Sequence, residues 1–296
     1  MNKNTQRLRN TENFSVSLQA KIDLQNMNIR PLSLILAIIL LSSCGEYNKI
    51  MKSNDREVKY TYAKKYFEEK KYSRSISLLE ELIHYFKGTD KAEESLYLLG
   101  QSYYNSKDYI SATEMFSTYY NTYPRGEYAE SALFYAAFGM YLDSPDPRLD
   151  QSKTYKAISE FQRYIEEYPQ TERAEQAKNY MFELQEKLAL KELRSAQLYL
   201  NMGNYRGNNY ESAVIIAREA LKNYPFSKYA EEYQMVILRS RFEYAENSTL
   251  EMQPERYRMV LDEYFNYKNS FPEGKHAKEA EKYYNKSQSK IEKLPS

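Results

Sequence analysis

The sequence predicts an all-α protein, an α-solenoid of about five helical-hairpin repeats with a long helix between repeats three and four. Two observations lead to this prediction. A short turn string recurs five times along the chain, and only eight of the 296 residues are glycine. So few glycines are typical of long helices joined by few turns. A chain of this length can also bury a substantial core.

Charge and residue counts exclude several classes of function. The 42 Lys and Arg residues balance 41 Asp and Glu residues, whereas a nucleic-acid binder needs a marked basic excess on one face. The single Cys excludes a disulfide framework within the chain, and no Cys or His pair has the spacing of a zinc site. We therefore expect no nucleic-acid partner, no metal and no cofactor.

No catalytic constellation is recognisable in the sequence. His84 falls near the end of an expected helix without a Ser or Cys partner, and His276 falls in the last turn string. Glu pairs such as Glu80-Glu81 are adjacent, so their side chains point to different sides of a helix. We therefore expect that the protein is not an enzyme.

The N-terminal region has the features of a lipoprotein signal. The apolar run Leu32–Leu41 is too short to cross a bilayer, which takes about 20 residues, but it suits the apolar part of a secretory signal. The following Leu-Ser-Ser-Cys resembles the bacterial lipoprotein cleavage box, with Cys44 as the lipidated first residue of the mature protein. We expect residues 1–43 to be an extension plus signal peptide and residues 44–55 to be a lipidated tether.

Two further readings concern this N-terminal region. Residues 1–26 are polar and Asn-rich, and signals normally stand at the start of a chain, so we expect Met27 to be the true start. The alternative for Cys44 is a buried thiol after a core helix. The absence of an amphipathic period around it argues against that alternative.

The turn string reads aromatic, Pro, any residue, small residue, two of any kind, Ala. Proline ends the preceding helix, the small residue is expected to be the N-cap of the next helix, and the alanine allows close helix packing. Lys87 replaces the proline in the first copy. The five copies begin at Phe86, Tyr123, Tyr168, Tyr224 and Phe271.

Residues 93–126 match the tetratricopeptide pattern at six anchor positions, and at a seventh Leu96 replaces the common Trp. In that geometry Gly100 and Ala112 are the small residues at the crossing of the two helices, and the larger anchors are core residues. The anchors are Leu96, Leu99, Gly100, Tyr103, Ala112, Phe116 and Pro124.

The repeats fall into two blocks. Residues 56–171 are expected to hold repeats one to three, with an irregular loop at 143–150 that contains two prolines. Residues 171–200 lack Pro and Gly and predict one long helix. Residues 172–296 are then expected to hold this connecting helix, repeats four and five, and a charged closing helix that caps the solenoid.

Two surfaces are candidate binding sites. Aromatic residues alternate with polar residues on the first helices of repeats one to three, which suits an extended peptide. The alternative is that many of these rings belong to the core. These groove candidates are Tyr60, Lys64, Phe67, Tyr97, Gln101, Tyr104, Phe134, Phe138 and Tyr141. In the fifth repeat, Arg239, Arg241 and Glu243 are candidates for docking a partner through salt bridges, the alternative being a solvated face.

The chain resembles the BamD family of outer-membrane β-barrel assembly lipoproteins in three features taken together. These are the cleavage box, the five repeats with their turn string, and Asp146-Pro147 before the second helix of the third repeat. The resemblance implies a lipid-anchored scaffold on the periplasmic face of the outer membrane. It further implies that the C-terminal repeats bind the barrel-forming, BamA-like subunit and that the N-terminal groove binds unfolded barrel substrates.

Two alternatives come from other classes of cell-envelope protein. SusD-like glycan-capturing lipoproteins also carry tetratricopeptide-type repeats, but sugar platforms favour Trp and this chain has none. Repeat proteins of the Tol-Pal type usually carry a coiled coil, and no heptad run is present here.

Overall fold

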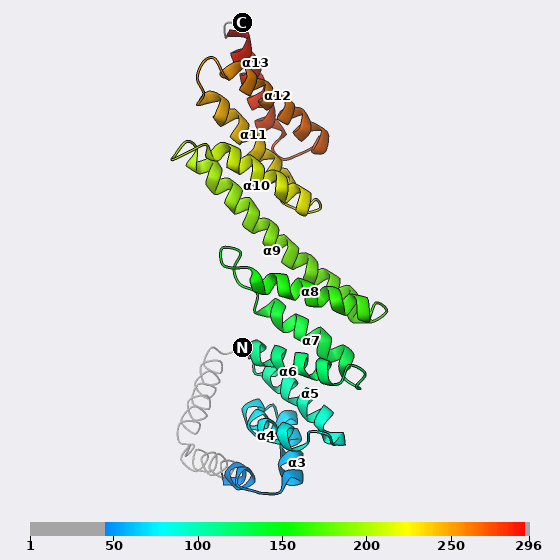
Figure 1. The fold of residues 1–296 in the computed structure, drawn as a ribbon. Helices are drawn as coiled ribbons and strands as arrows, with labels where there is room; N and C mark the ends of the chain where they lie inside the picture. Colours follow the sequence, from blue (N-terminus) through cyan, green and yellow to red (C-terminus); the bar gives the residue numbers. More distant parts are fainter. Residues whose placement is uncertain (1–44, 294–296) are drawn as a thin grey trace, which may run out of the picture. The chain divides into compact units, whose positions relative to one another are not determined.

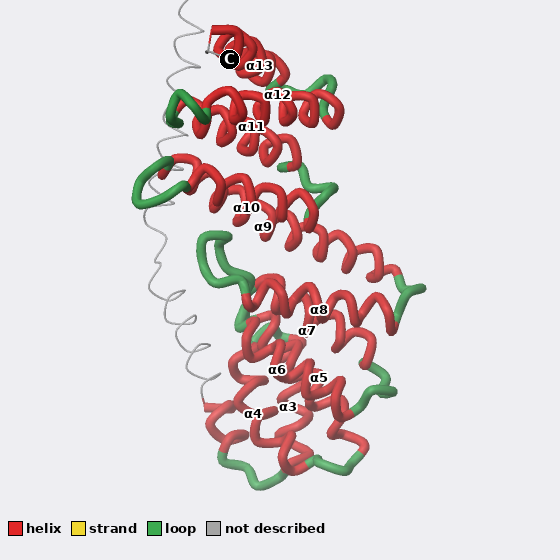
Figure 2. Tube along the Cα trace, turned by 45° about the horizontal axis from the view of Figure 1, so that its top comes forward, coloured by secondary structure: helices red, strands yellow, loops and turns green. Residues whose placement is uncertain are grey.

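The computed structural model describes residues 45–293, and all regular structure in this part of the chain is helical (Figures 1 and 2). Residues 45–51 form a short helix. The helices that follow are α3 (Arg56–Glu68), α4 (Tyr72–Tyr85), α5 (Asp90–Asn105), α6 (Tyr109–Thr122), α7 (Ala129–Leu142), α8 (Ser152–Glu167), α9 (Glu172–Met202), α10 (Asn209–Asn223), α11 (Ala230–Glu246), α12 (Gln253–Ser270) and α13 (Ala277–Lys293). The expected signal peptide, the expected start at Met27 and Cys44 lie outside the described residues.

The chain divides between Tyr85 and Phe86 into two compact units. The sequence instead suggested a division at residue 171. No compact unit ends there, because α9 packs on α8 and also on α10 and so runs through the second unit without a break. The division into two functional blocks at residue 171 stays a prediction.

The first unit is the hairpin of α3 and α4. Its centre is fully buried, with the Ser75 hydroxyl donating to the Ala63 carbonyl over 2.9 Å. The buried Lys59 ammonium bonds Glu81 at 2.6 Å. Residues 45–51 differ from the expected tether, because they are helical and Tyr47 packs edge-on against Tyr66 with ring centroids 5.9 Å apart.

The second unit is a solenoid of helical hairpins. From α5 to α13 each helix packs mainly on the next one, and α7, α9 and α11 also contact the helix two places further on (Figure 1). This unit contains the hairpins α5–α6, α7–α8, α9–α10 and α11–α12, and the first unit contributes the hairpin α3–α4. The predicted all-α fold of about five tetratricopeptide-like repeats is therefore confirmed. The helix α13 closes the second unit, as the charged tail predicted.

The turn strings end and restart helices as predicted, but of the five small residues only Ser227 accepts a backbone amide of the next turn, from Tyr229 at 3.2 Å. Thr89 and Thr171 directly precede α5 and α9 without any side-chain capping bond. In three other copies the helix begins only at the alanine, three residues after Gly126, Ser227 or Gly274.

The small residue instead makes room for a buried hydroxyl. A Cβ atom on Gly126 would lie 2.6 Å from the Tyr119 hydroxyl, and one on Gly274 would collide with the Tyr267 hydroxyl. Thr171 uses its own hydroxyl to bond Tyr164 over 2.8 Å. In these three copies, the turn residue is therefore small because a tyrosine from the preceding helix ends beneath it.

These tyrosines belong to a repeated interaction that we call the acid–tyrosine clamp. In each clamp, a tyrosine hydroxyl on the second helix of a repeat donates to a glutamate in the first turn of that repeat's first helix. The three clamps are Tyr119 with Glu93, Tyr164 with Glu130, and Tyr267 with Glu231. Two of the glutamates also accept the backbone amide of the following turn, Glu93 from Glu127 at 2.6 Å and Glu231 from His276 at 2.9 Å.

The helix crossing predicted in the second repeat is present. Gly100 is buried where α5 meets α6, and a Cβ atom there would lie 2.8 Å from the fully buried ring of Phe116. Ala112 is also fully buried in this core. The small residues therefore set the separation of the two helices, as the tetratricopeptide pattern predicts.

The long helix α9 supports the irregular loop that precedes α8. The Lys187 ammonium donates to the Ser144 hydroxyl over 2.8 Å, and Lys191 donates to the Leu149 carbonyl over 2.9 Å. One turn further on, Arg194 lies 3.8 Å from Asp146. Three cations on one side of α9 thus hold the loop in place.

Candidate functional site

Five of the expected groove residues of repeats two and three form a partly exposed aromatic face on α5 and α7. Tyr97, Gln101, Tyr104, Phe138 and Tyr141 are all half-buried. The Gln101 amide donates to the Tyr97 hydroxyl over 3.0 Å. The Tyr104 and Phe138 rings are 6.2 Å apart, and Phe138 stacks on Tyr141 at 5.6 Å. The rings therefore run as one strip from α5 to α7.

Tyr135 and Tyr180, which the sequence did not single out, complete this strip. The ring of Tyr180 on α9 lies 4.8 Å from Phe138 and 4.7 Å from Tyr141, and Tyr135 lies 5.1 Å from Tyr104. Tyr180 lies in the long helix α9, where the repeat pattern of the sequence gave no reason to select it. Only the packing of α9 on α7 brings it to this face.

Phe134 differs from its predicted role in the groove. It is buried at 5 % exposure and packs edge-on against Tyr164, with centroids 5.4 Å apart. The Arg173 guanidinium lies 5.5 Å from its centroid while bonding Glu130 at 2.6 Å. Phe134 is therefore a core residue behind the aromatic face.

The three candidates in the first repeat belong to the first compact unit. Tyr60 is buried at 7 % exposure, and the Lys64 ammonium lies 5.4 Å from its ring centroid. Phe67 packs edge-on against Tyr72 at 5.7 Å. Tyr60 thus contributes to the core of this unit, while Lys64 and Phe67 remain half-buried.

The hydroxyls of Tyr97, Tyr104 and Tyr141 stay protonated at neutral pH. Burial raises the pKa of Tyr97 and Tyr104, and burial together with a hydrogen bond to Glu183 raises the pKa of Tyr141 to about 12. That bond measures 2.5 Å. The face therefore offers neutral hydroxyl and amide groups between rings, which can bond the backbone of an extended peptide.

Both arginines that were candidates for partner docking are engaged within the chain. Arg239 makes a bidentate ion pair with Glu279 of α13, with both nitrogen–oxygen distances at 2.7 Å. Arg241 pairs with Glu211 of α10 at 2.5 Å. Glu243, half-buried on the same helix, contributes to the raised pKa of Tyr210, after the larger effect of burial. The two ion pairs tie α11 to its neighbours, so a docking role for these residues stays a prediction.

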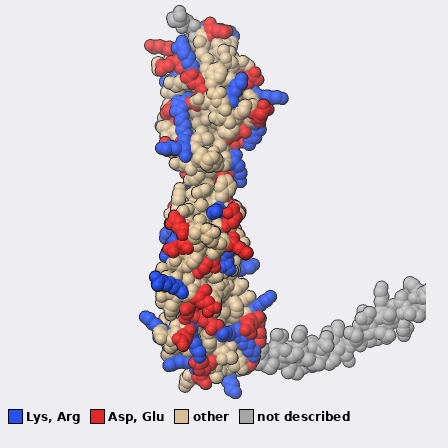
Figure 3. Space-filling view, turned by 90° about the vertical axis from the view of Figure 1, so that its right-hand side faces the viewer, with Lys and Arg blue, Asp and Glu red and all other residues tan. Residues whose placement is uncertain are grey.

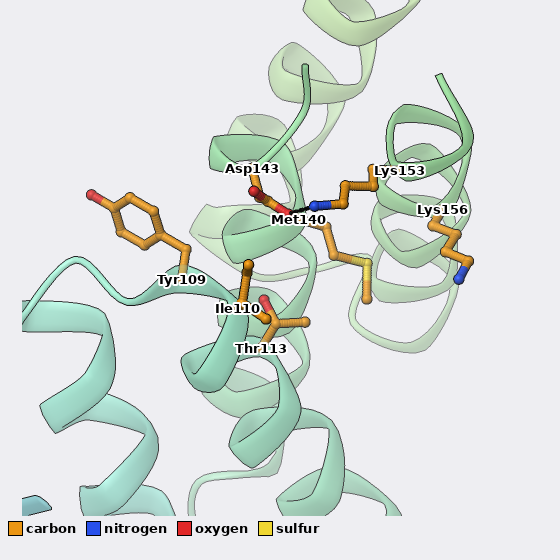
Figure 4. A pocket seen from close by; sticks show the side chains of 7 residues that line it. All are labelled: Tyr109, Ile110, Thr113, Met140, Asp143, Lys153 and Lys156. Atoms are coloured by element: carbon orange, nitrogen blue, oxygen red, sulfur yellow. Dashed lines mark hydrogen bonds and ion pairs between the residues drawn. The ribbon is translucent and has the colours of Figure 1, made fainter. Parts of the chain in front are cut away.

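A small pocket of about 270 Å³ opens between α6, α7 and α8 (Figure 4). Ile110 and Met140 give it an apolar wall, and Lys153 reaches across to Asp143 at 2.5 Å. The side chain of Tyr109 points away from the other lining residues (Figure 4). The ion pair between Asp143 and Lys153 thus gives the pocket a polar side opposite its apolar wall.

Two properties of residues 45–293 bear on the class of function. In this range no group of three or more His, Cys, Asp or Glu side chains is placed to hold a metal ion, and no helix is both long and apolar enough to span a bilayer. On the face shown in Figure 3, basic and acidic side chains are interspersed. No large region of that face is a uniformly basic surface for a polyanion.

Comparisons with known proteins give the following matches. Residues 52–207 match the family YfiO, described as outer membrane lipoprotein. The chain is 25% identical over 195 residues to the "Putative outer membrane protein assembly factor BamD" of Aquifex aeolicus; this match covers 65% of the chain and 62% of that relative's length. Among solved structures, a TPR2AB-domain–pHSP90 complex of yeast Sti1 matches with a TM-score of 0.37 and 13% identity, over 79% of this chain and 98% of the other.

Proposed function

Because the chain belongs to the YfiO family of outer membrane lipoproteins, to which the BamD-like assembly factors belong, we propose that it is a lipid-anchored scaffold for outer-membrane β-barrel assembly. In this proposal Cys44 carries the lipid, and the solenoid faces the periplasm. The chain binds a BamA-like barrel-forming subunit and unfolded barrel substrates, and it catalyses no reaction.

The observation that supports substrate binding is the aromatic face of α5, α7 and α9. Its rings supply apolar contact area, and its neutral hydroxyl and amide groups can orient an extended chain. An aromatic side chain at the end of a barrel strand would stack among Tyr104, Phe138 and Tyr180, whose mutual spacings suit ring contacts.

Membrane attachment is tested by fractionation. Cys44→Ala is expected to move the protein from the membrane fraction to the soluble fraction. Its thermal unfolding should not change, because residue 44 lies outside the described helices. Two acyl chains hold a protein stably at a bilayer, whereas none does. Retention of the variant after carbonate washing would contradict lipid anchoring at this residue.

The scaffold role is tested by copurification. The tagged full-length protein, extracted in mild detergent, is expected to bring down a large outer-membrane barrel protein. Glu243→Lys is the informative docking variant, since it leaves the Arg239 and Arg241 ion pairs intact, and it is expected to reduce recovery of the partner. Absence of any barrel protein from the wild-type sample would reject the scaffold proposal.

Substrate binding is tested by photo-crosslinking to an unfolded outer-membrane barrel protein. Tyr104→Ser combined with Phe138→Ser is expected to reduce crosslinking, because both rings leave the aromatic face. Phe265→Ser is the matched control, since Phe265 is 49% exposed on α12, away from this face. Equal loss in the control, or none in the double variant, counts against the aromatic face as the binding site.

A further inference from the structure

A second apolar cleft, of about 550 Å³, lies on α9, where Pro147 of the loop before α8 and the turn between α10 and α11 also line it. We call it the α9 cleft. Phe182 and Leu190 come from α9, and Phe226 comes from the turn. None of the described residues that line it belongs to the aromatic face, but Glu183 lines the cleft and also bonds Tyr141 of that face.

Phe226 is unusual when the five turn strings are compared with one another. Its side chain is 89% exposed, and it occupies the third position of the string. The other four copies place a glycine or a polar residue there, and all four are exposed: Gly88, Arg125, Gln170 and Glu273. The turn itself does not require an apolar residue at this position. The phenylalanine must therefore be explained by something outside the turn.

Phe226 does not stand alone on the surface. Phe182, which is 49% exposed, lines the same cleft, as does half-buried Tyr229. Single exposed apolar residues are normal on a protein surface, whereas several around one concavity mark an interaction site.

Glu186 gives this cleft a chemical preference. It is 9% exposed, and its Oε2 atom is buried without a hydrogen-bond partner among the described residues. The nearest cation, the Lys228 ammonium, is 4.0 Å from that atom, too far for a hydrogen bond, and its side chain is 68% exposed. The adjacent Lys187 is already bonded to Ser144. A buried carboxylate oxygen without a donor is costly, so the cleft lacks one donor.

We propose that the α9 cleft is a docking site for a protein segment that places a bulky apolar side chain between Phe182 and Phe226 and an Arg or Lys side chain against Glu186. Charge complementarity selects this occupant. A basic side chain supplies the missing donor and the opposite charge, whereas a carboxylate or a lipid phosphate diester has no donor to offer Glu186. This proposal is argued from the cleft alone and does not depend on the proposed assembly role.

The proposal is tested by selecting random dodecapeptides displayed on phage against the full mature chain. The expected peptides carry an apolar residue a few positions from Arg or Lys. Their affinity is then measured by fluorescence anisotropy. Glu186→Gln is expected to weaken binding by about tenfold or more, because it removes one charged hydrogen bond. Phe226→Ser is expected to weaken it by about as much, because the apolar side chain of the peptide loses a ring contact.

Controls separate this site from the aromatic face and from general instability. Phe265→Ser removes a ring of equal exposure to Phe182 on another helix, and it should leave the affinity unchanged. The Tyr104→Ser/Phe138→Ser variant should also bind the selected peptides normally, so that failure of this proposal and failure of the proposed function remain distinguishable. Urea unfolding of each variant confirms that it is folded.

Three results would overturn the proposal. Selected peptides that bind the Phe226→Ser and Glu186→Gln variants as tightly as the wild type would show that the α9 cleft is not the site. Enrichment of acidic peptides would reject the chemistry assigned to Glu186. Dimerisation of the wild type, lost in Phe226→Ser, would identify a second copy of this chain as the occupant instead.

Discussion

Replacing Gly100 with alanine tests the closest helix crossing in the second repeat. The added Cβ would lie 2.8 and 2.9 Å from two ring carbons of Phe116, which has no exposed surface and therefore no space to retreat into. Overpacking of this kind costs ~1–3 kcal/mol. Alanine regains about 1 kcal/mol of helix propensity over glycine. We therefore expect a net destabilisation of roughly 0–2 kcal/mol for Gly100→Ala, and a larger loss for Gly100→Leu.

The assay is urea unfolding followed by far-UV circular dichroism. Gly45→Ala is the control, because Gly45 is helical and a Cβ there meets no atom within 4 Å, so this variant should not be destabilised. Shrinking the neighbour in Gly100→Ala/Phe116→Leu should recover part of the loss from the first substitution, as coupled residues do. Two results would refute the close packing of Gly100 against Phe116. Gly100→Ala could be stabilised by the full gain in helix propensity, or Gly100→Leu could unfold at the same urea concentration as the wild type.

Three further predictions concern the clamps and the closing helix. Tyr119→Phe should lose about 1.5–3 kcal/mol of unfolding free energy in urea, because Glu93 loses a buried donor; an unchanged midpoint would show the clamp to be unimportant. Gly126→Ala should also be destabilised, since its Cβ would lie 2.6 Å from the Tyr119 hydroxyl, and the Gly126→Ala/Tyr119→Phe double variant should be less than additive. The Arg239 hydrogen bond lowers the pKa of Glu279 below 4.5. The ion pair therefore stabilises the fold above that pH, and its contribution is lost as the pH falls through the folded-state pKa. The difference in unfolding free energy between wild type and Glu279→Gln should shrink on acidification, and a pH-independent difference would contradict this.

Several of the 32 tyrosines serve one of two separate uses that the sequence did not distinguish. In the clamps, the ring fills the core while the hydroxyl reaches a glutamate on another helix, as for Tyr267 and Glu231. On the aromatic face, half-buried rings such as Tyr104 and Tyr180 contact one another. The sequence spacing places a tyrosine on a helix face, but the depth to which that face is buried depends on the neighbouring helix.

The candidate site was predicted in part for the same reason. The spacing of Tyr97, Gln101 and Tyr104 correctly places them on one side of α5, because helical periodicity is local. The same rule placed Phe134 with Phe138, yet α8 covers Phe134 and leaves Phe138 half-exposed. Which of two residues on one helix face is buried is decided by the angle at which the next helix crosses.

Charged residues show the limit of sequence reasoning most clearly. Arg239 and Arg241 stood out in an apolar run, but their partners, Glu279 and Glu211, lie 40 and 30 residues away in the chain. Nothing local pairs such residues. The unpartnered Oε2 of Glu186 likewise could not be recognised before the loop and the turn were seen around α9.

The sequence by itself determined the all-helical repeat architecture, the places where helices break, and the small residues at their crossings, because these follow from short-range rules about proline, glycine and helical period. The tertiary structure alone decided which tyrosines are clamps, which rings remain exposed, and that a cleft with a buried acid forms on α9. Those features depend on contacts between helices far apart in the chain, and their geometry is fixed only when the hairpins stack.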